Sequence, residues 1–189
     1  MLYEAIIIGI VAGWLAKGSL TNLAQIKMKY IWLVLGAFLI QVGMDYLGAK
    51  GFGEIVRWRL PLHLLSYLML FLFLWLHRGL PGIKLLALGF LCNCLVIVIN
   101  GGAMPATING IDPEYVKGLQ AGDWVTYTAI TESTNLPWLG DVLVLPWPKA
   151  KAFSLGDIFI SAGVFWLVFQ VMKGDRIHAR LTSVRKMKF

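Results

Sequence analysis

Charged residues are scarce in this sequence. Asp, Glu, Lys and Arg together make up 14% of its 189 residues, whereas 58% of the residues are hydrophobic. A soluble globular domain has about a quarter charged residues, and a disordered chain is more polar still. The composition therefore excludes both classes. We expect an integral membrane protein that forms a single membrane domain over residues 1–189.

Cysteine is also rare, because the chain has only Cys92 and Cys94, both in one apolar run. This number excludes a small domain held together by disulfides. Neighbours two positions apart on a helix point to different faces, so the pair is not placed to share a metal ion. We expect both cysteines to be packing residues, and we predict no metal site.

Motifs of well-known enzyme classes are absent as well. The sequence has no phosphate-binding loop, zinc-ligand spacing or serine-hydrolase elbow. His63 and His77 have a spacing that suits two stacked haems, but one chain offers only His178 as a further histidine ligand. We therefore expect no cofactor. The absence of a complete catalytic set favours a non-catalytic protein and leaves the question of enzyme activity open.

Long apolar runs are abundant, and a membrane-spanning helix needs about 20 such residues. The first run lacks the basic start and cleavage pattern of a signal peptide, so we expect it to be retained. It holds Gly9 and Gly13 in a GxxxG pattern, which permits close helix approach. We predict an all-α integral membrane protein, a five-span transmembrane helical bundle, with spans at about 2–16, 30–47, 60–76, 83–99 and 155–172.

Basic residues predict the orientation, because Lys and Arg gather in short cytoplasmic loops. In a five-span arrangement one side receives the tail 173–189 and the residues Lys17, Lys27, Lys29, Arg78 and Lys84. We therefore expect a bacterial inner-membrane protein with its N-terminus outside and its C-terminus in the cytoplasm. The link 18–27 should form an interfacial helix capped by Ser19 or Thr21. The outer link 48–59 also holds three basic residues, for which the sequence offers no explanation.

The net charge of +7 raises the question of a nucleic-acid partner. Much of the positive charge lies in the tail 173–189, directly after the last predicted span. A basic segment in this position is typical of the cytoplasmic side and of contact with anionic lipid. We expect the lipid bilayer to be a partner and nucleic acid not to be one.

The connection 100–153 is predicted to lie outside the cell and is too long for a plain loop. Residues 111–114 read Ile-Asp-Pro-Glu, which is typical of a helix start with Asp as the N-cap. The stretch 124–130 is rich in β-prone residues. The Pro- and Trp-rich stretch 137–148 indicates a loop at the membrane interface. We expect a small folded extracytoplasmic cap between the fourth and fifth spans.

Polar residues in or beside the predicted spans mark candidate sites, because they are unfavourable in lipid. The candidate binding residues are Asp45, His63, Asn93 and Asn100, and the candidate catalytic residues are Asp141 and Asp157. The predicted orientation places most of them near the outer interface. The alternative is that they are helix caps and interface residues, since Asp157 opens a span in the manner of a capping carboxylate.

Asp141 and Asp157 each end a Leu-Gly-Asp tripeptide. Two carboxylates that share one proton can activate water, one as base and one as acid. The stretches 140–142 and 154–158, with Asn-Gly-Gly-Ala at 100–103, resemble elements of type II (lipoprotein) signal peptidases, which implies an aspartyl hydrolase. The chain departs from that family: no spans separate the Asn element from Asp141, and position 154 is Ser where the family has Asn.

A resemblance to a second family covers most of the chain. The stretches 17–24, 100–105, 139–141 and 153–158 resemble small bacterial polytopic membrane proteins catalogued as a domain of unknown function. This resemblance implies an integral bacterial membrane protein and implies no activity.

We therefore keep three hypotheses for the function. The first is a non-catalytic accessory subunit that binds other membrane proteins, lipids or a second copy of itself. The second is an extracytoplasmic aspartyl hydrolase that uses Asp141 and Asp157. The third is a small-molecule or quinone-type binder between the spans, near Asn93 and Gln41.

Overall fold

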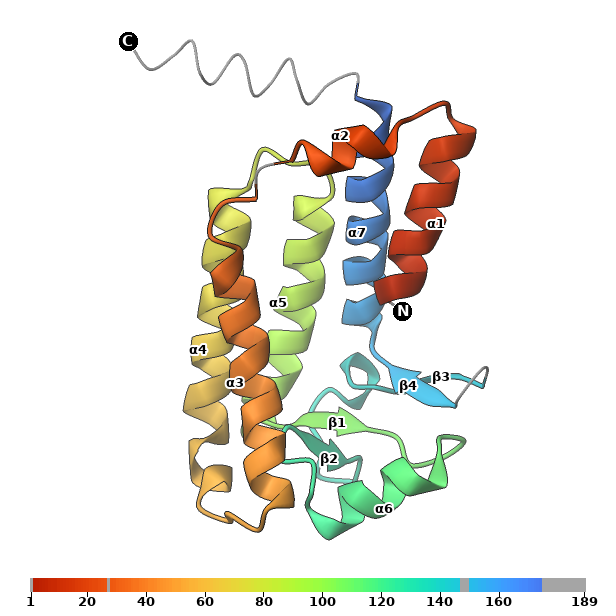
Figure 1. The fold of residues 1–189 in the computed structure, drawn as a ribbon. Helices are drawn as coiled ribbons and strands as arrows, with labels where there is room; N and C mark the ends of the chain where they lie inside the picture. The colour runs from red at the N-terminus through yellow and green to blue at the C-terminus, as the bar shows by residue number, and fades with distance from the viewer. Residues whose placement is uncertain (1, 27, 147–149, 175–189) are drawn as a thin grey trace.

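The computed structural model describes residues 2–26, 28–146 and 150–174, and within them five long helices form a bundle (Figure 1). They are α1 (Leu2–Leu15), α3 (Ile31–Ala49), α4 (Ile55–Leu76), α5 (Ile83–Ile99) and α7 (Leu155–Lys173). A short helix, α2 (Leu20–Ala24), follows α1, and the Ser19 hydroxyl accepts a hydrogen bond from the Thr21 N–H at its start. A helix is therefore present in the predicted link, with Ser19 as its cap.

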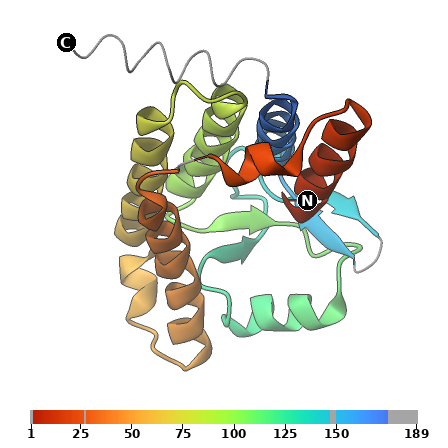
Figure 2. The same ribbon diagram turned by 45° about the horizontal axis from the view of Figure 1, so that its top comes forward.

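The bundle helices are arranged as a row that does not follow the chain order (Figures 1 and 2). α3 packs on α4, α4 on α5, α5 on α7, and α7 on α1. The last helix thus lies between α5 and the first helix. The two ends of the row are α1 and α3, which follow each other in the chain with only α2 between them.

The surface of these helices is apolar, as membrane helices require. Trp14, Leu15 and Leu39 are 73%, 78% and 73% exposed, which would be unfavourable in water but suits a lipid environment. Three helices, α3, α4 and α7, are long and apolar enough to cross a membrane, whereas α1 and α5 are shorter apolar helices. The prediction of helices that could cross a membrane is confirmed for these three.

Small residues let the helices on either side of α7 approach it closely. A Cβ atom at Gly9 would lie 3.0 Å from Val168 Cβ, and one at Gly13 would lie 2.7 Å from Met172 Sδ. The GxxxG pattern therefore packs against α7 within the bundle. On the other side, a Cβ at Gly89 would meet the Gly156 carbonyl oxygen, so α5 and α7 touch through their backbones.

The cap is built from short elements. The parallel strands β1 (Met104–Ala106) and β2 (Tyr127–Ala129) form one sheet, and the antiparallel strands β3 (Leu143–Leu145) and β4 (Lys151–Phe153) form another. Helix α6 (Pro113–Ala121) begins at the predicted N-cap Asp112. The 3-10 helix η1 (Pro137–Leu139) occupies part of the predicted interface loop, whose residues 147–149 lie outside the described residues.

The cap shares a hydrophobic core with the bundle. Met104 of β1 and Leu139 of η1 are buried in one cluster with Tyr67 of α4 and Val96 of α5. This shared core fixes the cap against the ends of α4 and α5. The all-α prediction thus holds for the bundle, but the fold as a whole adds two small sheets.

Charge is divided unequally between the two ends of the molecule. Every acidic residue in the described part of the chain lies in the cap or at the helix ends beside it: Glu4, Asp45, Glu54, Asp112, Glu114, Asp123, Glu132, Asp141 and Asp157. The links at the opposite helix ends carry only basic charge in their described residues: Lys17, Lys29, Arg78, Lys84 and Lys173. Among the described residues, one end of the bundle therefore carries only basic side chains, and the other carries both signs of charge.

Candidate functional site

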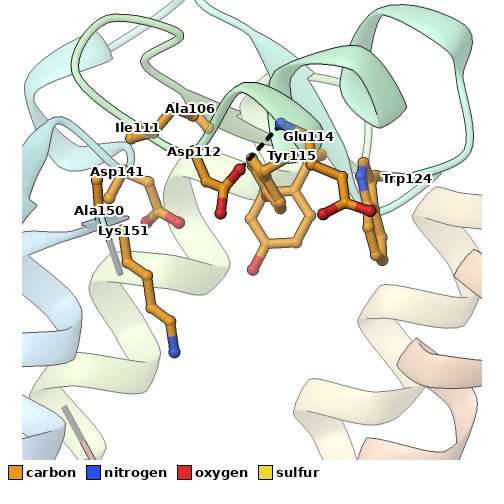
Figure 3. Close-up of a pocket in the computed structure, with 11 residues that line it drawn as sticks. Ala106, Ile111, Asp112, Glu114, Tyr115, Trp124, Asp141, Ala150 and Lys151 are labelled. Carbon is orange, nitrogen blue, oxygen red and sulfur yellow. Dashed lines mark hydrogen bonds between the residues drawn. The ribbon is translucent and has the colours of Figure 1, made fainter. Parts of the chain in front are cut away.

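The cap encloses a pocket of about 440 Å³ (Figure 3). Asp141 and Lys151 enter it from one side, and Glu114, Tyr115 and Trp124 enter it from the other. The complete lining is Ala106, Ile111, Asp112, Glu114, Tyr115, Trp124, Tyr127, Asp141, Ala150, Lys151 and Ala152. Its size is that of a site for a small organic molecule.

Backbone hydrogen bonds hold Asp141 beside β1. Its N–H donates to the Pro105 carbonyl at 2.8 Å, and its own carbonyl accepts from the Thr107 N–H at 2.9 Å. The residue is only 7% exposed, and Oδ1 of its carboxyl has no hydrogen-bond partner among the described residues. A buried polar atom without a partner is unusual in a folded protein.

The protonation of Asp141 follows from this burial. Burial raises the pKa of its carboxyl to about 8, and the negative charge of Asp157 adds to the effect. The carboxyl is therefore mainly neutral at pH 7 in the empty pocket. A buried carboxyl with a raised pKa in a cleft is a candidate functional group.

Aromatic rings form the opposite wall of the pocket. Tyr115 of α6 stacks on Trp124 with ring centroids 5.6 Å apart, and it meets the edge of Tyr127 at 5.9 Å. Gly118 permits this arrangement, because a Cβ there would collide with the Trp124 indole nitrogen. Burial raises the pKa of the Tyr115 and Tyr127 hydroxyls above their usual range, so both are neutral phenols at pH 7.

Two further acids and one base complete the charged groups of the pocket. Asp112 is partly engaged, because its Oδ1 accepts a hydrogen bond from the Glu114 N–H at 3.0 Å. The exposed Lys151 reaches toward α1, where its Nζ lies 6.0 Å from the ring centre of Tyr3. Nζ of Lys151 therefore has an aromatic neighbour outside the pocket lining.

Asp157 has a different environment from Asp141. Its Oδ1 accepts a hydrogen bond from Asn93 Nδ2 at 3.1 Å, and its Oδ2 accepts from the Ser154 N–H at 3.1 Å. Ser154 in turn caps α7 and donates to Asn93 Oδ1 at 2.8 Å. Asp157 thus closes a capping box and joins α7 to α5, but it does not line the pocket. The aspartyl dyad stays a prediction.

Two of the candidate binding residues attach the cap to the bundle. Both carboxylate oxygens of Asp45, at the end of α3, accept hydrogen bonds from Thr126, one from its N–H and one from its hydroxyl, each at 2.8 Å. Asn100 and Asn135 exchange two hydrogen bonds of 2.9 Å between side chain and backbone. These contacts hold the cap segments next to β2 and η1.

The remaining candidates lie inside the bundle. His63 is 2% exposed within α4, and its Nδ1 has no hydrogen-bond partner among the described residues. Gln41 donates to the Ser66 hydroxyl, which donates to the His63 carbonyl. Asn93 belongs to the separate Asp157 network, so the structure does not bring Asn93 and Gln41 together.

Sequence reasoning selected Asp141 but missed the aromatic residues that face it. Tyr115, Trp124 and Tyr127 come from two predicted elements, the helix after Asp112 and the β-prone stretch 124–130. The signal was present as three aromatic residues within a predicted cap. Nothing in the sequence indicated that the helix would fold over the strand and place them around one space.

Comparisons with known proteins identify the relatives of this chain but no activity. The model of a family of unknown function, DUF5317, matches residues 25–169. An uncharacterized protein from Thermotoga maritima is 32% identical over 158 residues, which is 82% of either chain. No solved structure matches. The resemblance to an uncharacterised membrane-protein family is confirmed, and the chain belongs to the DUF5317 family.

Proposed function

We propose that this chain is a five-span protein of the bacterial inner membrane that binds a small molecule in the cap pocket, on the outer face. One observation carries the proposal: the buried Asp141 carboxyl, with its unpartnered Oδ1, borders a pocket walled by aromatic rings. Burying a polar atom without a hydrogen bond is unfavourable. A ligand that contacts the Asp141 carboxyl from the pocket would give this buried group a polar partner.

The division of charge supports the orientation. The helix ends away from the cap carry only basic side chains in the described part of the chain, and such ends face the cytoplasm in most membrane proteins. Two of the basic residues of the link 48–59 make local contacts: Arg57 pairs with Glu54 at 3.3 Å, and Arg59 donates to the Gly101 carbonyl at 2.8 Å. These contacts give a structural role to two of the three basic residues that lie in the predicted outer link.

The packing supports five spans. α1 and α5 lie on the two sides of α7, which is long enough to cross a membrane. A helix of 14 residues, such as α1, is about 21 Å long at about 1.5 Å per residue. Local thinning of the bilayer and flanking polar residues can accommodate such a mismatch.

The two other hypotheses fit the geometry less directly. A hydrolase that used both Asp141 and Asp157 would need both carboxyls at one site, but Asp157 does not line the pocket and is held by Asn93 and Ser154. An accessory role is compatible with ligand binding, because the apolar outer faces of α1 and α3 have no neighbouring helix within the described residues on one side. That role would add a partner to the proposed function.

The orientation can be tested with one exposed cysteine. In a variant without Cys92 and Cys94, we expect Lys117→Cys on α6 to react with a membrane-impermeant maleimide in intact cells. Lys84→Cys, exposed at the opposite end of the bundle, should react only after the membrane is opened. The reverse pattern would place the cap in the cytoplasm and end the proposal in its present form.

Ligand binding can be tested by filling the pocket. The probes are small aromatic compounds, some cationic, some neutral and some anionic. We expect members of this set to show saturation-transfer NMR signals with the full chain in lipid nanodiscs. Ala152→Phe, which places a ring in the pocket, should reduce these signals at least about tenfold, since a filled site excludes its ligand. The control is Leu143→Phe, an exposed change on the adjacent strand outside the lining. Equal signals in both variants would show that the pocket is not the site.

A further inference from the structure

We propose that the ligand of the cap pocket is a small organic cation, whose ammonium group binds between the Asp141 carboxyl and the aromatic wall. This inference rests on the proposed function, because it specifies the ligand of the same pocket.

The ionisable lining favours a positive ligand. Three carboxyl groups, those of Asp112, Glu114 and Asp141, face one basic side chain, Lys151. The ammonium of Lys151 lies by the Tyr3 ring, at the α1 side of the pocket. No ion pair within the described residues joins Lys151 to any of the three acids. The lining therefore carries three acids, and none of them has an ion-pair partner among the described residues.

The aromatic wall strengthens this preference. The faces of Trp and Tyr rings carry negative electrostatic potential and attract ammonium groups that lie within about 6 Å of the ring centre. Tyr115 and Tyr127 meet at an interplanar angle of 80°, and Trp124 continues the Tyr115 wall. Rings set at a right angle present both a face and an edge to one space. Such sites bind methylated ammonium groups well.

A bare metal ion fits the pocket less well than an organic cation. No group of three or more His, Cys, Asp or Glu side chains in the described part of the chain is close enough together to hold a metal. The lining also includes apolar side chains from Ala106, Ile111 and Ala152. These would contact the carbon atoms of a ligand rather than a hydrated ion.

The protonation state of Asp141 depends on its surroundings. The charged and titratable groups around it are Asp157 on α7, Asp112, Glu114 and Tyr115 on or beside α6, Tyr127 on β2, Lys151 on β4, Tyr67 on α4 and Asp45 on α3. Burial favours the neutral form of the Asp141 carboxyl, and the negative charge of Asp157 adds to this preference. A cation within about 4–6 Å favours the carboxylate, and one proton is then released to the solvent for each cation bound.

Matched ligands of different charge test the inference on the full chain in nanodiscs. The first pair is choline and its uncharged carbon isostere, 3,3-dimethylbutan-1-ol. The second set is benzylamine, benzyl alcohol and benzoate. By titration calorimetry we expect each cation to bind at least about tenfold more tightly than its neutral counterpart, and benzoate to bind weakest, because of the charge preference.

The release of a proton gives a second readout. Between pH 6 and pH 8 the affinity for choline should rise by up to about tenfold per pH unit and then level off, because the site must lose one proton to bind. Titrations at pH 7 in buffers of different ionisation enthalpy should report about one proton released per cation. Asp141→Asn should remove both the pH dependence and the proton release, whereas Glu132→Gln, an exposed acid outside the pocket, should change neither.

The outcomes separate the two proposals. Binding of neutral or anionic members as tightly as the cations would overturn the cation inference and leave pocket binding in place. Cation binding that Asp141→Asn does not weaken would also overturn it. If no member of either set bound, both the inference and the proposed function would fail.

Discussion

Asp141→Asn is expected to make the protein more stable at neutral pH, although it alters a buried residue. The folded protein must keep the Asp141 carboxyl protonated, whereas the unfolded chain ionises it freely at pH 7. Asparagine has nearly the same shape and is neutral at every pH. At neutral pH, keeping Asp141 protonated in the folded state lowers the stability of the wild type. The variant has no carboxyl to protonate, so it does not lose this stability.

The direction of this stability change follows from the pKa of Asp141 in the folded and unfolded states. The pKa of Asp141 is raised to about 8 in the folded state, against about 3.9 for an unfolded aspartate. The folded state binds more protons between these values, so the contribution of Asp141 is fully present below about pH 4 and is lost as pH rises to about 8. The difference between variant and wild type should grow over this range and reach at most about 6 kcal/mol, at about 1.4 kcal/mol per pKa unit.

The measurement is equilibrium unfolding by SDS in mixed micelles from pH 4 to pH 9. Glu132→Gln serves as the control and should follow the wild-type curve, because Glu132 is exposed. A variant less stable than the wild type at pH 7 would mean that Asp141 is ionised and contributes as a charged group. That result would also remove the basis for proton release on ligand binding.

The helical part of the fold was predictable because it depends on short-range patterns. Apolar runs set the positions of the bundle helices. Asp112 is the N-cap that its sequence position indicates, and Asp157 takes part in capping α7 as expected, although the N-cap itself is Ser154. α4 is the main difference, since it begins at Ile55 rather than near residue 60. Arg57 and Arg59 made this turn resemble a loop, but they pair with Glu54 and Gly101 at the helix surface.

The pair of Leu-Gly-Asp tripeptides shows where sequence reasoning stopped. The two aspartates look alike in the sequence, but Asp157 has hydrogen-bond partners for both oxygens, whereas Asp141 has an unpartnered atom. The difference depends on Asn93, which lies 64 residues before Asp157. Which polar residues meet is set by the packing of α5 on α7, and a single sequence does not contain this information.

The row order of the helices was likewise not predictable. Each bundle helix has apolar residues on most of its surface, so no hydrophobic stripe identifies its neighbours. The small residues carry part of the information: Gly9 and Gly13 face α7, and so does Gly89. They indicate close helix contacts, but they do not say which helices make them.

Gly156→Ala is expected to cause the largest loss of stability in the bundle. A methyl group at this position would overlap Asn93 Oδ1 and would lie 2.8 Å from the Gly89 carbonyl oxygen. One of these atoms belongs to backbone and the other to a residue bonded to Asp157 and Ser154, so neither can move freely. We expect a loss of about 2–4 kcal/mol, because overpacking at a backbone contact adds to the rupture of buried hydrogen bonds.

Gly43→Ala is the matched control for this change. Gly43 also lies within a bundle helix, α3, but a Cβ there would meet no atom within 4 Å. We expect this variant to be as stable as the wild type or more stable by up to about 1 kcal/mol, because alanine favours helix over glycine. SDS unfolding of both variants gives the comparison, and size-exclusion profiles of solubilised membranes report on a variant too unstable to purify.

The same comparison tests how the bundle positions the pocket. Gly156→Ala would push Asn93 away from Asp157, and Asp157 is a charged neighbour of Asp141. A variant that folds should therefore show an altered pH dependence of stability, although position 156 lies outside the pocket lining. If Gly156→Ala and Gly43→Ala were equally stable, α5 and α7 could not be in backbone contact. Asp157 would then have no fixed position from which to act on Asp141.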